Sequence, residues 1–123
     1  MKVYVAAPWK HRKIAQSVAS LLEAVGFTVV SRWLAGHEDR ALSQYAREDL
    51  ADLEQCHALL LLNIELSEGK AFEQGYAMAL DIPIVAVGRP SMVFHHLPYI
   101  WVETYSEAIA ALRDIQKYPF SRP

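Results

Sequence analysis

Five consecutive apolar residues, 58–62 (ALLLL), lie in the middle of the chain. A run this short, bounded by polar residues on both sides, predicts a β-strand rather than a helix. A strand that is apolar on both faces belongs in a parallel sheet that is covered by helices on both sides. The rest of the chain must therefore supply further strands and the helices that cover them.

The apolar pattern on either side alternates between short β-rich runs and helical periods. The expected strands are residues 2–6, 27–31, 58–62, 82–87 and 99–102. The expected helices are residues 12–25, 42–53, 70–80 and a last one that begins near 106. Gly26 supplies a left-handed C-cap, and Thr104 and Glu107 have capping-box spacing.

This alternation predicts an α/β fold: one flavodoxin-like, Rossmann-like domain over residues 1–123. Its doubly wound parallel sheet has five strands in the order 2-1-3-4-5 and helices on both faces. Ligands bind such sheets where the connections reverse direction, which here lies between the loops after the first and third strands. Residues 7–13 and 63–70 are therefore the expected site.

Composition restricts the partners of such a domain. The 123 residues carry 12 basic and 14 acidic side chains, and 53% are hydrophobic. A net charge of −2 gives no polybasic surface for nucleic acid or membrane and favours a small metabolite. No apolar run of about 18 residues and no secretory signal is visible, and the single Cys56 permits no internal disulfide. We expect a cytoplasmic protein.

The segment 67–77 (SEGKAFEQGYA) carries the strongest local signal. Gly69 is expected to allow a tight turn close to a ligand, and Glu73 to lie in the first turn of the next helix. Backbone N–H groups there would favour an ionised carboxylate, a competent nucleophile towards an anomeric carbon. The alternative interpretation is a helix-stabilising charge with no catalytic role.

A second carboxylate, Asp49, lies on the helix before the third strand. Glycosidic cleavage uses two carboxyl groups, of which one attacks carbon and the other transfers a proton. Asp49 is the candidate for the second role, with a solvated acidic helix face as the alternative. Glu48, Asp52 and Glu54 are expected to form such a solvated face.

The loop after the first strand combines small, aromatic and cationic residues. Ala7 lets a ligand approach the backbone, and Trp9 offers a stacking face for a base or sugar. Lys10 and Arg12 are placed to hold a phosphate at the start of the helix. An exposed basic helix start without any ligand is the alternative.

Several other signals are weak. Gly69-Lys70 lacks the remainder of a P-loop, and no GxGxxG follows the first strand, so no dinucleotide site is indicated. The adjacent His95 and His96 have no further ligands at metal-binding spacing. Cys56 is interpreted as a small buried hydrophobe at a helix end. We expect neither a metal nor a cofactor.

The chain resembles the nucleoside 2-deoxyribosyltransferase family in three blocks that occur in the same order, VYVAAPW, REDLADLEQCHALLLL and SEGKAFEQGYAMALDIPIVAV. This family includes relatives that hydrolyse 2′-deoxynucleoside 5′-monophosphates. The resemblance runs from Val3 to about Val102. It implies that Glu73 forms a covalent glycosyl-enzyme intermediate and that Asp49 is the proton donor or the group that orients the base. The implied reaction is a retaining double displacement.

Release of the sugar to water would make the protein an N-hydrolase, and release to a second base would make it a transferase. Ser67 and Lys10 resemble the phosphate-binding residues of the hydrolases, whereas Pro8 departs from their pattern. We favour the hydrolase slightly. The expected substrate-binding residues are Tyr4, Ala7, Trp9, Lys10, Ser67, Gly69 and His95.

Members of this family complete their active site from a neighbouring subunit, which implies a homodimer or a higher homo-oligomer. Residues 91–99 (SMVFHHLPY) are the corresponding segment, and His95 is expected to reach the partner's cleft. Two alternatives stay open. One is a non-catalytic nucleotide-binding module with this fold, and the other is cleavage of a different N-glycoside, such as a nicotinamide dinucleotide.

Overall fold

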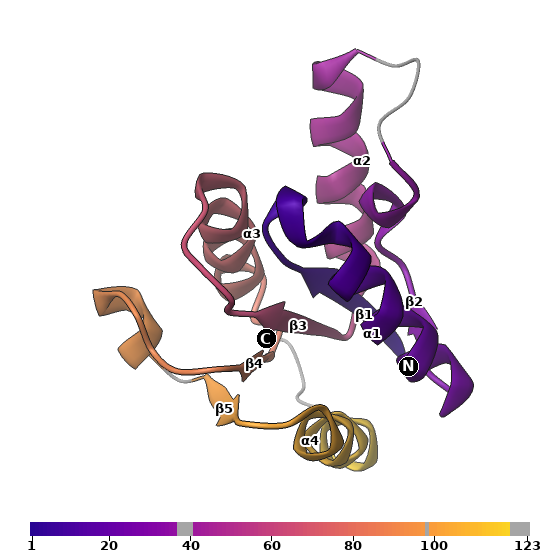
Figure 1. Cartoon of the computed structure of the whole chain (residues 1–123), viewed down its shortest axis with the longest axis vertical. Coiled ribbons are helices and arrows are strands. Elements are labelled where there is room, and N and C mark those ends of the chain that lie inside the picture. Colours follow the sequence, from indigo (N-terminus) through magenta and orange to yellow (C-terminus); the bar gives the residue numbers. More distant parts are fainter. Residues whose placement is uncertain (37–40, 98, 119–123) are drawn as a thin grey trace.

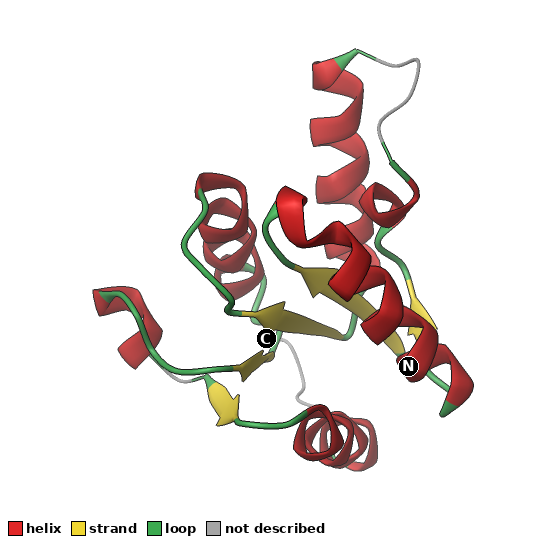
Figure 2. Ribbon diagram, in the orientation of Figure 1, coloured by secondary structure: helices red, strands yellow, loops and turns green. Residues whose placement is uncertain are grey.

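A computed structural model describes residues 1–36, 41–97 and 99–118. Within these residues, a parallel sheet of five strands has the order β2-β1-β3-β4-β5. Helices surround the sheet (Figures 1 and 2). The α/β class and the predicted strand order are therefore confirmed.

The strands are β1 (Lys2–Ala6), β2 (Thr28–Val29), β3 (Ala58–Leu62), β4 (Ile84–Val87) and β5 (Ile100–Val102). The α-helices are α1 (Arg12–Ala24), α2 (Leu42–Gln55), α3 (Glu68–Ala79) and α4 (Tyr105–Lys117). Short 3-10 helices lie in the connections after β1, β2 and β4; they are η1 (Trp9–His11), η2 (Arg32–Ala35) and η3 (Val93–His96).

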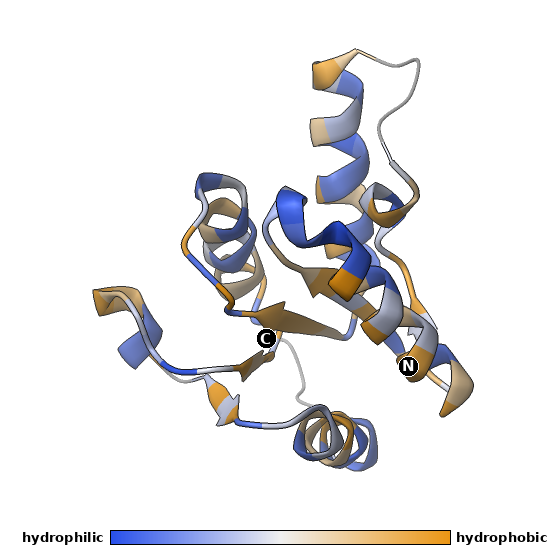
Figure 3. Ribbon diagram, viewed as in Figure 1, coloured by the Kyte–Doolittle hydropathy of each residue, from blue (hydrophilic) through white to orange (hydrophobic). Residues whose placement is uncertain are grey.

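Helices α2 and α3 pack against each other on one side of the sheet, and α1 and α4 cover the other side (Figure 1). Every residue of β3 is buried, as its uniform apolar run predicts. The apolar colouring in Figure 3 accordingly concentrates on the strands, while the helices alternate between apolar and polar residues. Leu22, Leu53 and Leu112 anchor three of the helices in the core.

Strand β2 is shorter than the predicted 27–31, because side chains replace its backbone bonds to β1. Regular pairing covers only Lys2 with Thr28 and Val3 with Val29. Beyond it, the N–H of Val5 donates to Oγ of Ser31 over 2.7 Å, and Nε1 of Trp33 donates to the carbonyl of Val5 over 2.9 Å. These two bonds satisfy the backbone of β1 where it approaches the expected ligand site.

Helix caps explain where two helices begin. Thr104 accepts a hydrogen bond from the N–H of Glu107 and donates its hydroxyl to Oε1 of Glu107, which confirms that these two residues cap the start of α4. Ser67 caps α3 by accepting from the N–H of Lys70 over 3.2 Å. Helix α3 consequently begins at Glu68, two residues before the predicted start, and this changes the positions of Gly69 and Glu73 in the helix.

No helix in the described part of the chain is long and apolar enough to cross a membrane. Cys56 is buried at the C-terminal end of α2, as predicted. Gly26 has a φ of 102° directly after α1, in agreement with its expected role in ending that helix.

Candidate active site

Three titratable side chains from three elements influence one another near the reversal point of the sheet. Tyr4 comes from the buried strand β1, Asp49 from α2 and Glu73 from α3. The charges of Asp49 and Glu73 both act on the Tyr4 hydroxyl, and the charge of Asp49 acts on Glu73. The structure thus brings together the two predicted carboxylates and one of the predicted substrate-binding residues.

Glu73 lies in the second turn of α3, and the expectation that it occupies the first turn is wrong. Burial raises the pKa of its carboxyl to about 8; the Tyr4 hydroxyl opposes this rise, and the negative charge of Asp49 adds to it. Its atom Oε2 is inaccessible and has no hydrogen-bond partner of regular geometry among the described residues. A carboxylate ionised by the helix N-terminus was expected, but the structure favours a carboxyl group that retains its proton at neutral pH.

The pKa of Asp49 is also raised, to about 6. Burial is the largest cause, and the neighbouring carboxylates of Asp52 and Glu48 act in the same direction, whereas the Arg32 guanidinium opposes them. Between about pH 6 and pH 8, Asp49 and Glu73 together therefore hold one proton. Such a pair can supply one ionised and one protonated carboxyl group in the same site.

Tyr4 is fully buried, and its hydroxyl has no hydrogen-bond partner of regular geometry in the described regions. Burial and the two nearby carboxylates raise its pKa, so the phenol stays neutral. A neutral phenol is a hydrogen-bond donor. Tyr4 is consequently placed to donate to Glu73 when that side chain becomes ionised.

The loop after β1 presents aromatic and basic groups, as predicted, but much of it is already paired. The Arg12 guanidinium lies 4.5 Å from the centre of the Trp9 ring, and Trp9 is 49% exposed. Nζ of Lys10 forms a 2.8 Å ion pair with Glu65, and this cation lowers the pKa of the Glu65 carboxyl. A pocket of about 300 Å³ is lined by residues 9–14. Ala7 is buried behind this loop.

Ser67 and Gly69 have structural positions that differ from expectation. Ser67 uses its Oγ to cap α3, although its hydroxyl hydrogen stays available as a donor. Gly69 lies inside the first turn of α3 and not in a tight turn, and a Cβ added to it would meet open space. The expected tight turn at Gly69 is therefore wrong, whereas the contact of Gly69 with a ligand stays a prediction.

His95 is 1% exposed and lies inside its own chain. Its ring packs against Tyr99 and Trp101, at centroid distances of 5.7 and 5.2 Å, and its Nδ1 accepts a hydrogen bond from the N–H of Ser91. Burial lowers its pKa. The structure thus contradicts the expectation that His95 projects into a partner's cleft.

Sequence reasoning missed a buried polar network beside His95. Lys70 and Gln74, one turn apart on α3, are each 2% exposed. Lys70 donates to Oδ1 of Asn63, while Gln74 accepts from the Tyr99 hydroxyl. Burial lowers the pKa of Lys70. Their i, i+4 spacing indicated a shared helix face, but nothing in the sequence marked that face as buried.

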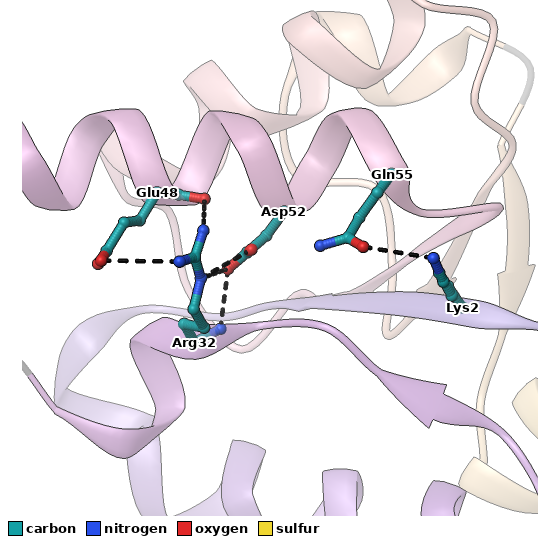
Figure 4. A network of polar contacts seen from close by, with 5 residues as sticks. All are labelled: Lys2, Arg32, Glu48, Asp52 and Gln55. Atoms are coloured by element: carbon teal, nitrogen blue, oxygen red, sulfur yellow. Dashed lines mark hydrogen bonds and ion pairs between the residues drawn. The ribbon is translucent and has the colours of Figure 1, made fainter.

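The acidic residues around Asp49 do not form the solvated face that was expected. Asp52 is buried, and it accepts hydrogen bonds from Nε and from the backbone N–H of Arg32 (Figure 4). Glu48 lies 3.7 Å from the same guanidinium, and its side chain is only 16% exposed. Only Glu54 is exposed, where it accepts from the Tyr76 hydroxyl. Arg32 had not been identified as part of the site.

Within residues 1–36, 41–97 and 99–118, no group of three or more His, Cys, Asp or Glu side chains is arranged to hold a metal ion.

Comparison with solved structures supports the fold. The CMP N-glycosidase BcmB of Clostridium botulinum superposes with a TM-score of 0.68 and 19% identity, over 92% of this chain and 98% of that chain. A 2-deoxyribosyltransferase from the psychrotolerant bacterium Bacillus psychrosaccharolyticus superposes with a TM-score of 0.72 and 18% identity, over 100% of this chain and 99% of that chain. No curated protein sequence gives a significant match.

A family model described as nucleoside 2-deoxyribosyltransferase matches residues 3–100. The match includes Tyr4, Asp49 and Glu73, the three side chains that the fold brings together. Because this model covers most of the sequence, the chain belongs to the nucleoside 2-deoxyribosyltransferase family of enzymes.

Proposed function

We propose that this enzyme cleaves the N-glycosidic bond of a nucleoside or a nucleoside 5′-monophosphate and releases the sugar to water. The observation that carries the proposal is that α2, α3 and β1 bring the carboxyl groups of Asp49 and Glu73 together beside the Tyr4 hydroxyl. One ionised and one protonated carboxyl group are what a retaining glycosidic cleavage requires.

Because Glu73 has the higher pKa, the form with the shared proton on Asp49 is a minor one, and we propose that it is the reactive form. In the first step, the ionised carboxylate of Glu73 in this form attacks C1′ of the sugar. The bond between C1′ and the base nitrogen breaks, its electron pair stays on the base, and the base takes the proton held by Asp49. Donation from the Tyr4 hydroxyl stabilises the ionised Glu73 before the attack. The product of this step is a glycosyl ester on Glu73.

In the second step, water attacks C1′ of the ester, and Asp49, now ionised, accepts a proton from that water. The C1′–oxygen bond to Glu73 breaks, which restores its carboxylate, and the two inversions leave the sugar configuration unchanged. Each side chain thereby returns to its starting state.

Transfer of the sugar to a second base is the other candidate function. It is favoured by the family to which the chain belongs and by the similarity to a transferase over the full length of both chains. Similarity to a CMP N-glycosidase favours hydrolysis instead. The two reactions share the first step and differ only in what attacks the glycosyl ester.

For the monophosphate, Ser67 and Lys10 are the proposed phosphate contacts. The Ser67 hydroxyl would donate to a phosphate oxygen at the N-terminus of α3, where the helix favours an anion. Lys10 would exchange its exposed partner Glu65 for the phosphate. The stacking face of Trp9 is proposed to contact the base or the sugar.

We also propose that two copies of the chain associate through η3. Val93 and Phe94 are 75% and 62% exposed there, and Leu97 is exposed beside them. Apolar side chains presented together in this way are typical of a protein–protein contact. Phe94→Asp should convert a dimer to a monomer in size-exclusion chromatography with light scattering, and a wild-type monomer would contradict the contact.

The reaction is tested by incubating the protein with deoxynucleosides and deoxynucleoside monophosphates, with and without a second free base. Release of base without exchange supports hydrolysis, whereas exchange identifies a transferase. Release from monophosphates alone supports the roles of Lys10 and Ser67. Failure to release or exchange any base over a broad panel would contradict the proposal.

Roles of the two carboxyl groups are separated by intact-mass analysis. Rapid acid quenching of a reaction should trap a sugar adduct on the peptide that contains Glu73. Glu73→Gln should abolish the adduct and lower kcat by about 10⁴-fold or more. Asp49→Asn should retain the adduct and lower kcat by roughly 10²–10⁴-fold. An adduct on Asp49 would reverse the proposed roles.

A further inference from the structure

Arg32 fixes the buried carboxylate of Asp52, which lies about one turn after Asp49 on α2. Nε of Arg32 donates to Oδ1 of Asp52 over 2.9 Å, and the backbone N–H of Arg32 donates to Oδ2 over 3.0 Å (Figure 4). Asp52 is 1% exposed, whereas the Arg32 side chain is 52% exposed. Both oxygens of Asp52 are thus occupied by donors from η2.

Asp52 lies three residues after Asp49 on α2, so the two side chains share one face of the helix. Glu48, the residue before Asp49, adds a second carboxylate, and its oxygen lies 3.7 Å from the Arg32 guanidinium. Two negative charges and one positive charge leave a net negative charge beside Asp49. Across the site, Glu73 of α3 and Tyr4 of β1 also face Asp49.

A fixed negative charge next to a carboxyl group favours its protonated form. Among the causes that raise the pKa of Asp49, the charge of Asp52 follows burial and precedes that of Glu48, while Arg32 acts in the opposite direction. Burial holds the negative charge of Asp52 in place. The positive charge of the Arg32 guanidinium opposes the effect of Asp52 on Asp49 only weakly, because the guanidinium is exposed and solvent screens it. Asp52 therefore acts on Asp49 without contacting substrate.

We infer that Asp52, held by Arg32, is a positioning residue that raises the proton affinity of Asp49 and so increases the fraction of enzyme with the shared proton on Asp49. The inference rests on the proposed function, in which Asp49 delivers that proton to the departing base. Without Asp52, Asp49 would lose its proton at lower pH, and the fraction of enzyme with a protonated donor at neutral pH would fall.

The decisive variant is Asp52→Asn, which removes the charge and keeps the size of the side chain. Glu54→Gln is the matched control, because it removes the same charge from an exposed position on the same helix, where Glu54 accepts from Tyr76. For each protein, the Asp49 carboxyl is titrated by carbon-13 NMR, and kcat/KM is measured against pH with the nucleoside or monophosphate that the wild type cleaves.

In Asp52→Asn, the Asp49 titration and the acidic limb of the kcat/KM profile should both move to lower pH. The value of kcat/KM near pH 7 should fall several-fold. The upper limit is roughly 150-fold, which corresponds to loss of the whole rise in the Asp49 pKa from 3.8 to about 6. Glu54→Gln should leave the titration and the limb in place. A merely structural role for Asp52 would lower activity without moving either one.

Unfolding of Asp52→Asn would move the test to Glu48→Gln, for which a shift in the same direction is expected. An unchanged Asp49 titration in a folded, active Asp52→Asn overturns the inference and leaves the proposed function intact. A wild type that cleaves no nucleoside or nucleotide, yet shows the NMR shift in Asp52→Asn, contradicts the proposed function and supports the coupling of Asp52 to Asp49.

Discussion

The buried ammonium group of Lys70 donates a 2.8 Å hydrogen bond to Oδ1 of Asn63. Asn63 follows β3, and its own Nδ2 donates to the carbonyl of Arg89 over 2.7 Å and to Oγ of Ser91 over 3.1 Å, in the loop after β4. Lys70 thus connects the start of α3 with two neighbouring loops at the carboxyl edge of the sheet. The cost of burying its charge makes this connection sensitive to mutation.

Asn63→Ala should destabilise the protein by about 2 kcal/mol, because it removes an acceptor from a buried charged donor. Lys70→Met should cost less, since it removes the charge together with its need for an acceptor. Chemical denaturation of both variants and of the double mutant measures these differences. Lys10→Met, at the exposed ion pair with Glu65, is the control and should have a smaller effect. Equal costs for Asn63→Ala and Lys10→Met would contradict this account.

Stability should depend on pH through Glu73. Its pKa is about 8 in the folded protein and near 4.5 in an unfolded chain, so the folded state binds the proton more tightly. Unfolding then releases a proton, and the free energy of unfolding decreases as pH rises from about 4.5 to 8. Glu73→Gln should gain at least about 1 kcal/mol relative to wild type between pH 5 and pH 9. If the difference in free energy of unfolding between Glu73→Gln and wild type does not change with pH, the Glu73 carboxyl is solvated and not buried.

The pH dependence of kcat/KM should be bell-shaped, with limbs near pH 6 and pH 8. The active form has one proton on the pair, and it is lost when a second proton binds or the last one leaves. Asp49→Asn should abolish the falling limb, because only the ionisation of Glu73 then governs activity. Initial rates in buffers of constant ionic strength provide the measurement. A falling limb that persists in Asp49→Asn would assign it to another group.

Ser67 allows the helix cap to be separated from the proposed phosphate contact. Ser67→Ala should cost about 1 kcal/mol of stability through loss of the cap. Ser67→Asp should retain the cap, since an aspartate oxygen can accept the same N–H, but should repel a phosphate. With monophosphate substrates KM should therefore rise in Ser67→Asp, and with nucleosides it should change little. Equal changes in KM for both substrates would remove Ser67 from the phosphate site.

Local rules predicted the fold well where a single residue pattern decides the structure. The apolar run 58–62 could form only a buried strand, and Thr104 with Glu107 predicted the start of α4. Strand β2 was predicted too long because the bonds of Ser31 and Trp33 to Val5 depend on tertiary structure. The start of α3 was misplaced because Ser67 had been considered as a ligand residue and not as a cap.

The sequence predicted which two carboxyl groups lie at the candidate site, but not how the fold changes their pKa values. Asp49 and Glu73 were both identified, yet the burial that raises the pKa of each carboxyl depends on how α2, α3 and β1 pack together. Asp52 looked like one of several surface acids because its partner Arg32 lies 20 residues away. Distant pairing of this kind leaves no periodic signal in a single sequence.

Helices α2 and α3 each contribute one member of the carboxyl pair, and they pack against each other on one side of the assembled sheet. Neither helix alone, nor a collapsed chain with native helix content, contains the proton-sharing arrangement. Catalytic turnover therefore reports on completed tertiary assembly. During refolding from denaturant, the enzyme should regain its far-ultraviolet circular dichroism before it regains turnover, and the delay would measure the docking of α2 against α3.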